Sequence, residues 1–293
     1  MGLRTIISER QRRLGAELKQ LREQAGFSAG EAAEQVGMGR GQLSQIETAK
    51  TTILTERLRE LTAVYGCTDK AYIDALVEMS ESTGKGWWSA YRKRMRQVSL
   101  NLAELEANAV KLRTHQSLFI PGLFQTPEYA QAIFASPKLG FESIEGALDF
   151  RMERQHILTR EAPPTVHAVI HEAALHMRFG GTEVVRAQLL RLIELARLPN
   201  VTIQVYPFSA QAYGALSGNF VYVAPKVPQL STVILEQATG PHYVGDRDQL
   251  ALYRSLFERL AENALAPIDL SLAPEAHSVK NSLGLIQHLL YTL

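Results

Sequence analysis

The sequence predicts a mainly α-helical protein with an α+β domain in its C-terminal part. Residues 1–81 repeat apolar side chains at the three- and four-residue steps of helices. A polar, glycine-rich joint follows at 82–86. Beyond it, helical segments are interspersed with short runs that alternate at period two, which indicates strands. We therefore expect an N-terminal five-helix bundle in 1–81, a helical segment and a small mixed sheet with helices in 87–270, and a tail with a short helix in 271–293.

The composition is that of a soluble protein with two domains. The chain has 293 residues, of which 46% are hydrophobic and 21% charged, and its net charge is only +1. The whole molecule therefore has no general attraction to nucleic acid, but its charge is unevenly distributed. Residues 1–22 hold six basic residues against Glu9 and Glu17, and we expect this segment to face phosphates. The basic residues are Arg4, Arg10, Arg12, Arg13, Lys19 and Arg22.

Nothing in the sequence indicates export or a membrane span. Cys67 is the single cysteine, so it can form neither an internal disulfide nor a thiolate cluster. No apolar run reaches the roughly 18 residues that a membrane helix needs, and the N-terminus lacks the apolar core of a signal peptide. We expect a cytoplasmic protein that has no cofactor, no metal and no membrane partner.

The segment 28–47 has the pattern of two short helices joined by a glycine turn. Ser28 and Glu31 form a capping box, in which each side chain accepts a hydrogen bond from the other residue's backbone N–H. Gly37 then provides the positive φ that ends the first helix sharply. The first helix of the pair is therefore expected to lie between Ser28 and Gly37.

The second helix of the pair, about 39–47, is apolar on one face only. Its large apolar residues are Leu43 and Ile46, three positions apart. The other side chains point to solvent and are of the kinds that read base edges or hold phosphates in a major groove. They include Arg40, Gln42, Ser44 and Gln45, with Glu47 at the end.

Further helices are expected on both sides of this pair. Apolar residues recur at helical spacing before it at Leu14, Leu18 and Leu21, and after it at Leu58, Leu61 and Val64. A fifth helix is expected to begin at Asp69 and to end near Glu81. Five helices in this order form one small core.

The N-terminal region resembles the Cro-like, xenobiotic-response-type helix-turn-helix family. The residues that carry the resemblance are Leu21, Arg22, Gly26, Ser28, Leu43, Ser44, Ile46 and Glu47. Two positions depart from the family pattern, because Ala29 stands in place of a phosphate-binding glutamine and Ala49 in place of a glycine. A left-handed alanine costs about 1 kcal/mol relative to glycine. We therefore expect the loop around Lys50 to follow a different path.

The resemblance implies a DNA-binding domain with base-reading and phosphate-binding residues. We expect Arg40 and Gln45 to read bases, and Arg22 and Lys50 to hold phosphates. The other residues of the predicted DNA-binding surface are Ser28, Gly41, Gln42 and Ser44. Because one small module gives too little affinity for a unique site, we also expect a homodimer on an inverted repeat in double-stranded DNA.

A tryptophan pair and a basic cluster follow the joint. Trp87 and Trp88 are followed by Arg92, Lys93, Arg94 and Arg96, with no acidic residue between Lys85 and Arg96. Nucleic-acid binding is one interpretation of this pattern. A surface helix with both tryptophans buried and the charges solvated is favoured, because tryptophan is mostly buried in globular proteins.

The second domain is expected to alternate helices with a few strands. Helices are predicted at about 100–112, 128–134, 144–158, 182–197, 247–265 and 283–290. Strands are predicted at 166–170, 201–206, 220–223 and 232–235. Between the first two helices, the segment 118–127 is irregular but unusually hydrophobic, so it must be covered by other parts of the domain.

Two interpretations of the segment 118–127 stay open. It packs on the α+β core, or it forms one wall of a ligand pocket, since such pockets are mostly apolar with a few polar groups. The apolar residues of the predicted pocket are Phe119 and Phe124 on one side and Tyr206, Phe208 and Tyr213 opposite them. The polar residues are Gln125, Arg151 and Gln204.

The second region resembles the C-terminal domain of actinomycete WhiJ-like regulators. The resemblance is carried by the segments 87–88, 120–130, 151–155 and 199–208. It implies a transcriptional regulator, sometimes encoded beside a small partner protein in an antitoxin-like arrangement. Two functions therefore stay open, a regulator that senses a small molecule or partner, and a protein-interaction antitoxin whose DNA binding serves autoregulation.

Two segments resemble enzyme motifs, but neither matches its motif well. His171, Glu172 and His176 resemble the zinc-protease motif, but the histidines are five positions apart in place of four. On a regular helix this step places the second imidazole about 140° from the first, so the two cannot share a metal. The segment 180–182 before a helix is interpreted as a capped turn, because no strand leads directly into it and no lysine accompanies it. We expect a protein that is not an enzyme.

Overall fold

The computed structural model describes residues 6–135, 143–210, 218–237, 240–271 and 281–293. The chain divides into two compact units. The first comprises Met1–Ala90 and Ser99–Leu105, and the second Tyr91–Val98 and Glu106–Leu293. The first unit thus extends beyond the predicted boundary at 82–86 and takes in a short helix and part of the next one. Each unit is described by itself below.

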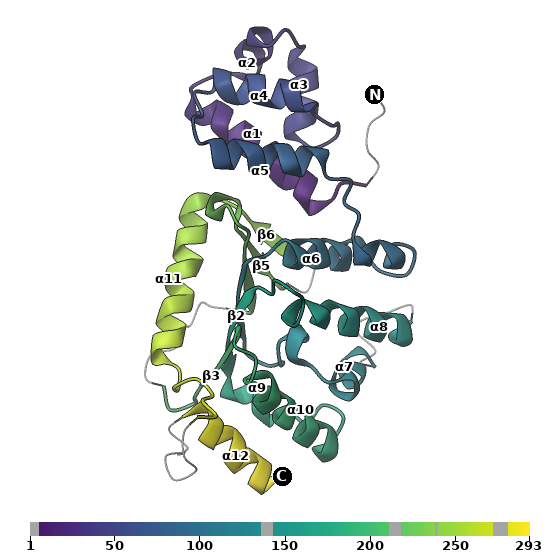
Figure 1. Ribbon diagram of the computed structural model, residues 1–293, viewed down its shortest axis with the longest axis vertical. Helices are drawn as coiled ribbons and strands as arrows, with labels where there is room; N and C mark the ends of the chain where they lie inside the picture. Colours follow the sequence, from purple (N-terminus) through teal and green to yellow (C-terminus); the bar gives the residue numbers. More distant parts are fainter. Residues whose placement is uncertain (1–5, 136–142, 211–217, 238–239, 272–280) are drawn as a thin grey trace. The chain divides into compact units, whose positions relative to one another are not determined.

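The first unit is a bundle of helices, as the sequence predicts (Figure 1). Its first five helices are α1 (Glu9–Gln24), α2 (Ala29–Gln35), α3 (Arg40–Glu47), α4 (Thr55–Val64) and α5 (Lys70–Glu81). The capping box at α2 is confirmed, because Ser28 Oγ accepts from Glu31 N at 3.2 Å and Glu31 Oε2 accepts from Ser28 N at 2.8 Å. Asp69 caps α5 through Tyr72 N at 3.1 Å. Local side-chain chemistry therefore determines where these helices begin.

The core of the first unit holds α3 close against α1. Leu18, Leu43 and Leu58 are fully buried there. Gly15 lies in the middle of α1, and a Cβ at this position would be 2.5 Å from the backbone oxygen of Glu47 at the end of α3. Because backbone cannot move aside as a flexible side chain can, only glycine permits this approach.

The loop after α3 differs from the prediction. Ala49 adopts the left-handed conformation, with φ of 60°, that the sequence was expected to avoid. The backbone N–H of Lys50 donates to Gln45 O at 2.8 Å, and that of Ala49 donates to Ile46 O at 2.9 Å. This pair of bonds is the Schellman helix end, which satisfies two carbonyls of the last turn and offsets the strain of about 1–2 kcal/mol. Alanine therefore makes here the left-handed helix end for which glycine is usual.

The second unit contains a six-stranded mixed sheet in the described part of the chain, with strand order β3-β2-β1-β4-β5-β6. The strands are β1 (Lys111–Gln116), β2 (Thr165–His171), β3 (Val201–Tyr206), β4 (Phe220–Ala224), β5 (Thr232–Leu235) and β6 (His242–Val244). Strands β1, β2 and β3 are parallel, and β4, β5 and β6 continue the sheet in antiparallel pairs. Four of these strands are the predicted ones, and β1 and β6 were missed.

The strand β1 corrects the prediction of a helix over 100–112. The helix α6 (Gln97–Ala107) ends earlier, and Leu112 belongs to the strand. Since β1 lies between β2 and β4, its polar side chains find partners across the sheet. Thr114 Oγ1 donates to Phe220 O at 3.2 Å, and His115 Nδ1 lies 3.0 Å from Val169 O. A polar sequence can therefore form a central, buried strand.

Helices cover both faces of the sheet. Figure 1 shows α11 (Arg247–Asn263) on one face, and α7 (Pro127–Phe134), α8 (Ile144–Gln155), α9 (Glu172–His176) and α10 (Thr182–Leu195) on the other. Short 3-10 turns lie at Trp87–Tyr91, Gly122–Phe124, His156–Leu158 and Pro228–Leu230. The residues predicted as a separate tail include α12 (Ser282–Thr292), which packs on the second unit. Ser282 Oγ accepts from Val205 N of β3 at 2.9 Å, so this helix is part of the fold.

Candidate nucleic-acid interface

The helix α3 presents one apolar and one polar face. Leu43 and Ile46 are buried, with 0% and 5% of their surface exposed. The predicted base-reading side chains Arg40 and Gln45 are exposed. The other exposed residues of the predicted surface on this helix are Gly41, Gln42 and Ser44. With apolar residues three positions apart facing the core, the polar residues between and beside them must face solvent.

Two more residues of the predicted DNA-binding surface, Ser28 and the predicted phosphate contact Lys50, lie at the surface beside this helix. Ser28 is exposed at the start of α2, where its Oγ accepts the backbone N–H of Glu31. Lys50 is exposed directly after the left-handed Ala49. Positions at the start of α2 and the end of α3 flank the base-reading face, as phosphate-binding positions do in helix-turn-helix domains.

The predicted phosphate contact of Arg22 is wrong. Its Nε donates to Glu47 Oε1 at 2.7 Å and its Nη2 to Glu47 Oε2 at 3.0 Å. Its remaining amino group donates to Phe27 O at 2.7 Å, and the residue is only 7% exposed. Glu47, predicted to point at solvent, is the buried partner. Arg22 therefore ties the end of the recognition helix to α1 and is not available to DNA.

Two more basic residues of the segment 1–22, which was expected to face phosphates, form buried ion pairs as Arg22 does. Arg10 Nε lies 2.7 Å from Glu104 Oε1, and Arg13 Nε lies 2.7 Å from Glu17 Oε1, with all four side chains largely buried. Arg12 and Lys19 alone of the described basic residues in this segment keep more than half of their side chains exposed, at 60% and 55%. Arg4 lies outside the described residues. Much of the positive charge of this segment is therefore paired with carboxylates inside the unit.

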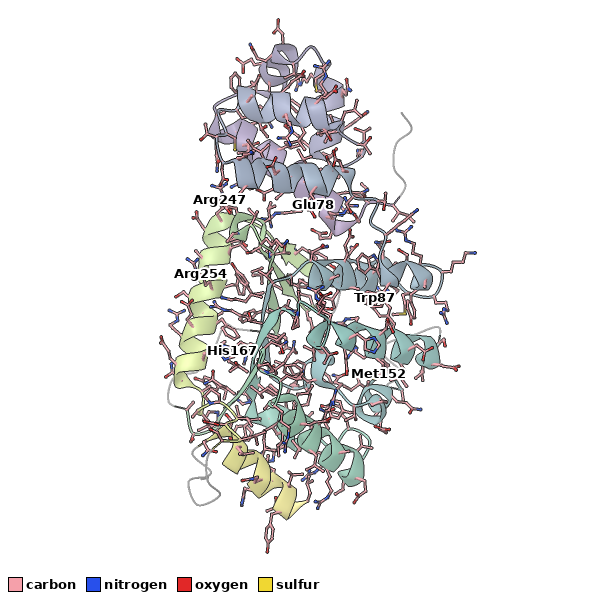
Figure 2. The ribbon with its side chains drawn as sticks, in the orientation of Figure 1. Glu78, Trp87, Met152, His167, Arg247 and Arg254 are labelled. Carbon is pink, nitrogen blue, oxygen red and sulfur yellow. The ribbon has the colours of Figure 1, made fainter. Side chains whose placement is uncertain are left out.

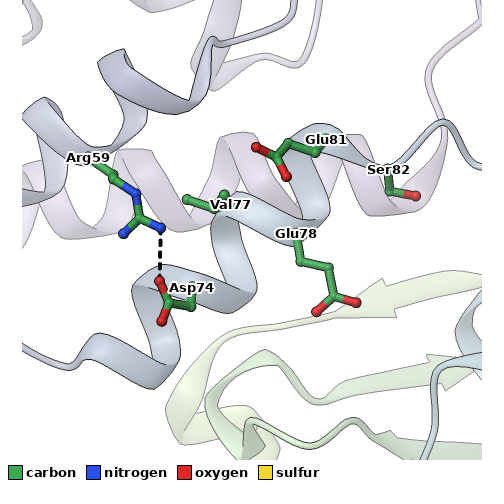
Figure 3. A pocket seen from close by; sticks show the side chains of 6 residues that line it. All are labelled: Arg59, Asp74, Val77, Glu78, Glu81 and Ser82. Carbon is green, nitrogen blue, oxygen red and sulfur yellow. Dashed lines mark hydrogen bonds and ion pairs between the residues drawn. The ribbon is translucent and has the colours of Figure 1, made fainter.

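An acidic hollow marks a different face of the first unit (Figure 3). It has a volume of about 570 Å³ and lies along α4 and α5. Arg59 Nη2 pairs with Asp74 Oδ1 at 2.9 Å there, which leaves Glu78 and Glu81 as additional carboxylates at its surface. Carboxylates repel phosphates, so this face is not suited to DNA. The recognition face of α3 is the one surface of this unit with matching chemistry that we find in the described residues.

Comparison with known families agrees with this geometry. Residues 13–76 match the family model described as a helix-turn-helix domain. The first unit is therefore a helix-turn-helix domain, and the protein is of the DNA-binding regulator class.

The rest of the chain defines the family more narrowly. Residues 100–270 match the model described as a domain of unknown function, DUF5753, which is more than half of the 293 residues. The chain belongs to the DUF5753 family. No curated protein and no solved structure matches it. Among the described residues, no helix is long and apolar enough to cross a bilayer.

The predicted ligand pocket is not formed, because its residues lie on opposite faces of the sheet. Gln204 Nε2 donates to Ala261 O and Leu265 O at 3.0 and 2.9 Å, on the face that α11 covers. Tyr206 belongs to the apolar cluster on that same face. Phe124 and Gln125 instead lie beside α8 and α10. Side chains alternate across a strand, so Gln204 and Tyr206 cannot reach the other layer.

The segment 118–127 packs in the core, which was the simpler of its two interpretations. Gln188 of α10 accepts from Thr126 N and donates to Phe124 O, both at 2.8 Å. Gln155 of α8 donates to Gln125 O at 2.7 Å. Side-chain amides thus satisfy the backbone groups of this irregular, buried segment.

The other predicted pocket residues are dispersed. Phe119 stacks on Phe179 with ring centroids 5.1 Å apart. Phe208 is 61% exposed, and its ring lies 5.4 Å from that of His171 and 5.6 Å from that of His176. Tyr213 lies outside the described residues.

His171, the first histidine of the zinc-protease-like motif, precedes α9 as its cap, where its Nδ1 accepts from Ala173 N at 3.1 Å. This capping bond explains the motif-like histidine without a metal.

Arg151 is the predicted pocket residue with the most unusual environment. Its Nη1 donates to Gln125 Oε1, and its guanidinium carbon lies 4.9 Å from the centroid of the Phe134 ring. Burial and the like charge of Arg154 lower the pKa of Arg151 to about 9. Arg154 itself holds Glu106 with two bonds of 2.9 and 2.7 Å. Burial and Arg154 therefore disfavour the positive charge of Arg151, and Gln125, which accepts its hydrogen bond, is a neutral amide.

The face of the sheet under α11 holds three histidines that sequence reasoning did not single out as a group. His115 is fully buried, and burial lowers its pKa to about 4. His167, labelled in Figure 2, packs against Phe257 of α11 and lies 2.7 Å from Gln204 Oε1. Burial lowers the pKa of His167 and of His171 as well. Only the strand register of β1 and β2, which the sequence did not reveal, brings these rings to one face.

Proposed function

We propose that this protein is a sequence-specific, homodimeric transcriptional regulator whose second unit responds to an effector. The observation that carries the DNA-binding part is the exposed polar face of α3 above the buried Leu43 and Ile46. The resemblance to WhiJ-like regulators supports a role in transcription. One module contacts only a few base pairs, which supports a dimer on an inverted repeat with half-sites one DNA turn apart.

We expect Arg40→Ala and Gln45→Ala to relax specificity at particular operator positions. Arginine to guanine and glutamine to adenine each contribute about 1 to 3 kcal/mol of discrimination. Genomic footprinting by immunoprecipitation would provide the operator. Titrations of each variant against all single-base changes of that operator would then measure the ranking of sequences.

A matched control is Arg59→Ala, which removes the same charge from an exposed ion pair in the acidic hollow. It should leave the ranking unchanged. The same titrations give the binding stoichiometry, and two chains per operator are expected for a dimer. A ranking that Arg40→Ala does not alter would show that α3 is not the reading helix.

Effector binding in the second unit is proposed on the environment of Arg151. A cation whose pKa is lowered by burial gains stability from a nearby negative charge. Two carboxylates, Glu106 and Glu236, act on the charge of Arg151, but Glu106 is already held by Arg154 in a two-bond ion pair, and in the described residues no ion pair within 4.0 Å joins Glu236 to Arg151. An anionic group, such as a carboxylate or phosphate, would therefore be the favoured ligand class at Arg151, with the Phe134 ring beside it. This assignment keeps Gln125 and Arg151 of the predicted site and gives up the other residues.

We expect an anionic effector to raise the melting temperature of the wild-type chain and not that of Arg151→Gln. A ligand at a hundred times its dissociation constant adds about 2.7 kcal/mol of stability. A thermal-shift screen of carboxylates and phosphates measures this effect. Arg191→Gln, at an arginine of α10 that pairs with Glu194 at 2.7 Å, is the control that should keep the shift. If no compound shifts the wild type while a small protein co-purifies with it, the antitoxin-like function replaces the sensor.

A further inference from the structure

The segment Arg92–Arg96 is a dense positive patch that the proposed recognition helix does not include. Four of its five residues are basic, and the chain has no acidic residue from Ser82 to Ala103. Arg92, Lys93, Arg94 and Arg96 are all exposed. In the described part of the chain, no ion pair within 4.0 Å joins Lys93, Arg94 or Arg96 to a carboxylate.

Aromatic residues hold this segment in place while its charges face solvent. Tyr91 packs edge-on against Phe150 of α8, with ring centroids 5.1 Å apart. The guanidinium of Arg94 lies 5.1 Å from the centroid of the Tyr91 ring. The tryptophan prediction is confirmed for Trp88, which is 8% exposed, whereas Trp87 is only partly buried. A segment that is anchored before it binds, with its basic side chains exposed, loses little conformational entropy when it binds.

Nearby acidic residues compensate only part of this charge. Burial first, and then Glu153 and Asp149 of α8, raise the pKa of Tyr91, so these two carboxylates lie within electrostatic range. The exposed basic residues of the segment outnumber these two carboxylates, and the patch stays positive.

We propose that the segment Arg92–Arg96 binds the phosphate backbone of DNA and adds sequence-independent affinity to the reading by α3. The inference rests on the proposed function. Arg92 follows Glu81, the last residue of α5, by only eleven positions. Lysine and arginine that neutralise phosphates release counterions from the duplex, and this release is the general source of non-specific DNA affinity. Double-stranded DNA is favoured over other polyanions because the same chain carries a helix-turn-helix domain.

The test replaces Lys93, Arg94 and Arg96 together by glutamine in the full chain. Binding to the operator and to a scrambled duplex is titrated between about 50 and 200 mM salt, where each phosphate contact contributes about 0.9 to the slope of log K against log salt. We expect the slope to fall by about 2 to 3 units on both duplexes. The ranking of operator variants should stay that of the wild type.

The matched control replaces three exposed arginines of α11, Arg247, Arg254 and Arg259, by glutamine, with the same change in net charge. Figure 2 labels two of these positions. The control should keep the wild-type slope, and the melting temperatures of both triple variants should match that of the wild type. A wild-type slope in the 93/94/96 variant, or an equal fall in both variants, would overturn the inference. If the 93/94/96 variant lost binding to single-stranded RNA and bound both duplexes as the wild type does, the inference would also be overturned. A wild type that binds no duplex would refute the proposed function instead.

Discussion

Replacing Arg22 by alanine should lower the free energy of unfolding of the first unit by about 3 to 5 kcal/mol. The substitution leaves Glu47 buried, with its side chain 6% exposed and without the two guanidinium bonds that now satisfy it. An unpaired buried charge is far more costly than the pair is favourable. Since Glu47 ends α3, the variant should also lose DNA binding through displacement of the recognition helix.

Hydrogen exchange of the α1 and α3 amides would measure this effect within the two-unit chain. Two controls separate the buried pair from a general loss of charge. Arg59→Ala breaks an ion pair whose side chains are 50% and 46% exposed, and it should cost less than about 1 kcal/mol. Arg22→Met with Glu47→Leu removes both charges and should recover most of the stability. If Arg22→Ala costs no more than Arg59→Ala, the ion pair does not hold α3 in place.

Lowering the pH from 7 to 4 should cost the second unit about 3 kcal/mol through His115 alone. The pKa of this buried imidazole is lowered from 6.5 to about 4 because burial disfavours its charged form. The unfolded chain therefore binds the proton first. The contribution to stability is complete above pH 6.5 and is lost as the pH falls towards 4. His167 and His171 shift in the same direction and add to the effect.

Urea unfolding at several pH values, followed by amide exchange in β1 and β2, would measure this dependence. His115→Gln keeps a donor for Val169 O but does not titrate, so its stability should depend less on pH by about 3 kcal/mol over this range. His156→Gln, at a side chain that is 74% exposed, should retain the wild-type dependence. An unchanged pH dependence in His115→Gln would mean that this imidazole is not the buried neutral group described above.

The recognition helix and its neighbours were determined by the sequence itself. The capping box of Ser28 and Glu31, the positive φ of Gly37 and the spacing of Leu43 and Ile46 all act within a few residues along the chain. Helices form through such local interactions, so the five helices and the exposed residues of α3 were predictable. The loop after α3 was not, because the hydrogen bonds that offset the strain of Ala49 had to be seen in place.

Long-range partners were decided only by the tertiary structure. The role of Arg22 depends on Glu47, which lies 25 positions along the chain, and that of His115 on Val169, which lies 54 positions along. The strand β1 was missed because Leu112 is its only apolar residue, so its sequence shows neither an apolar run nor an alternation of apolar and polar residues, and its polar side chains find their partners only in the folded sheet. The predicted pocket failed for a related reason. Sequence order does not show on which face of the sheet Gln204 and Arg151 lie, because strand register and the packing of α8 and α11 determine it.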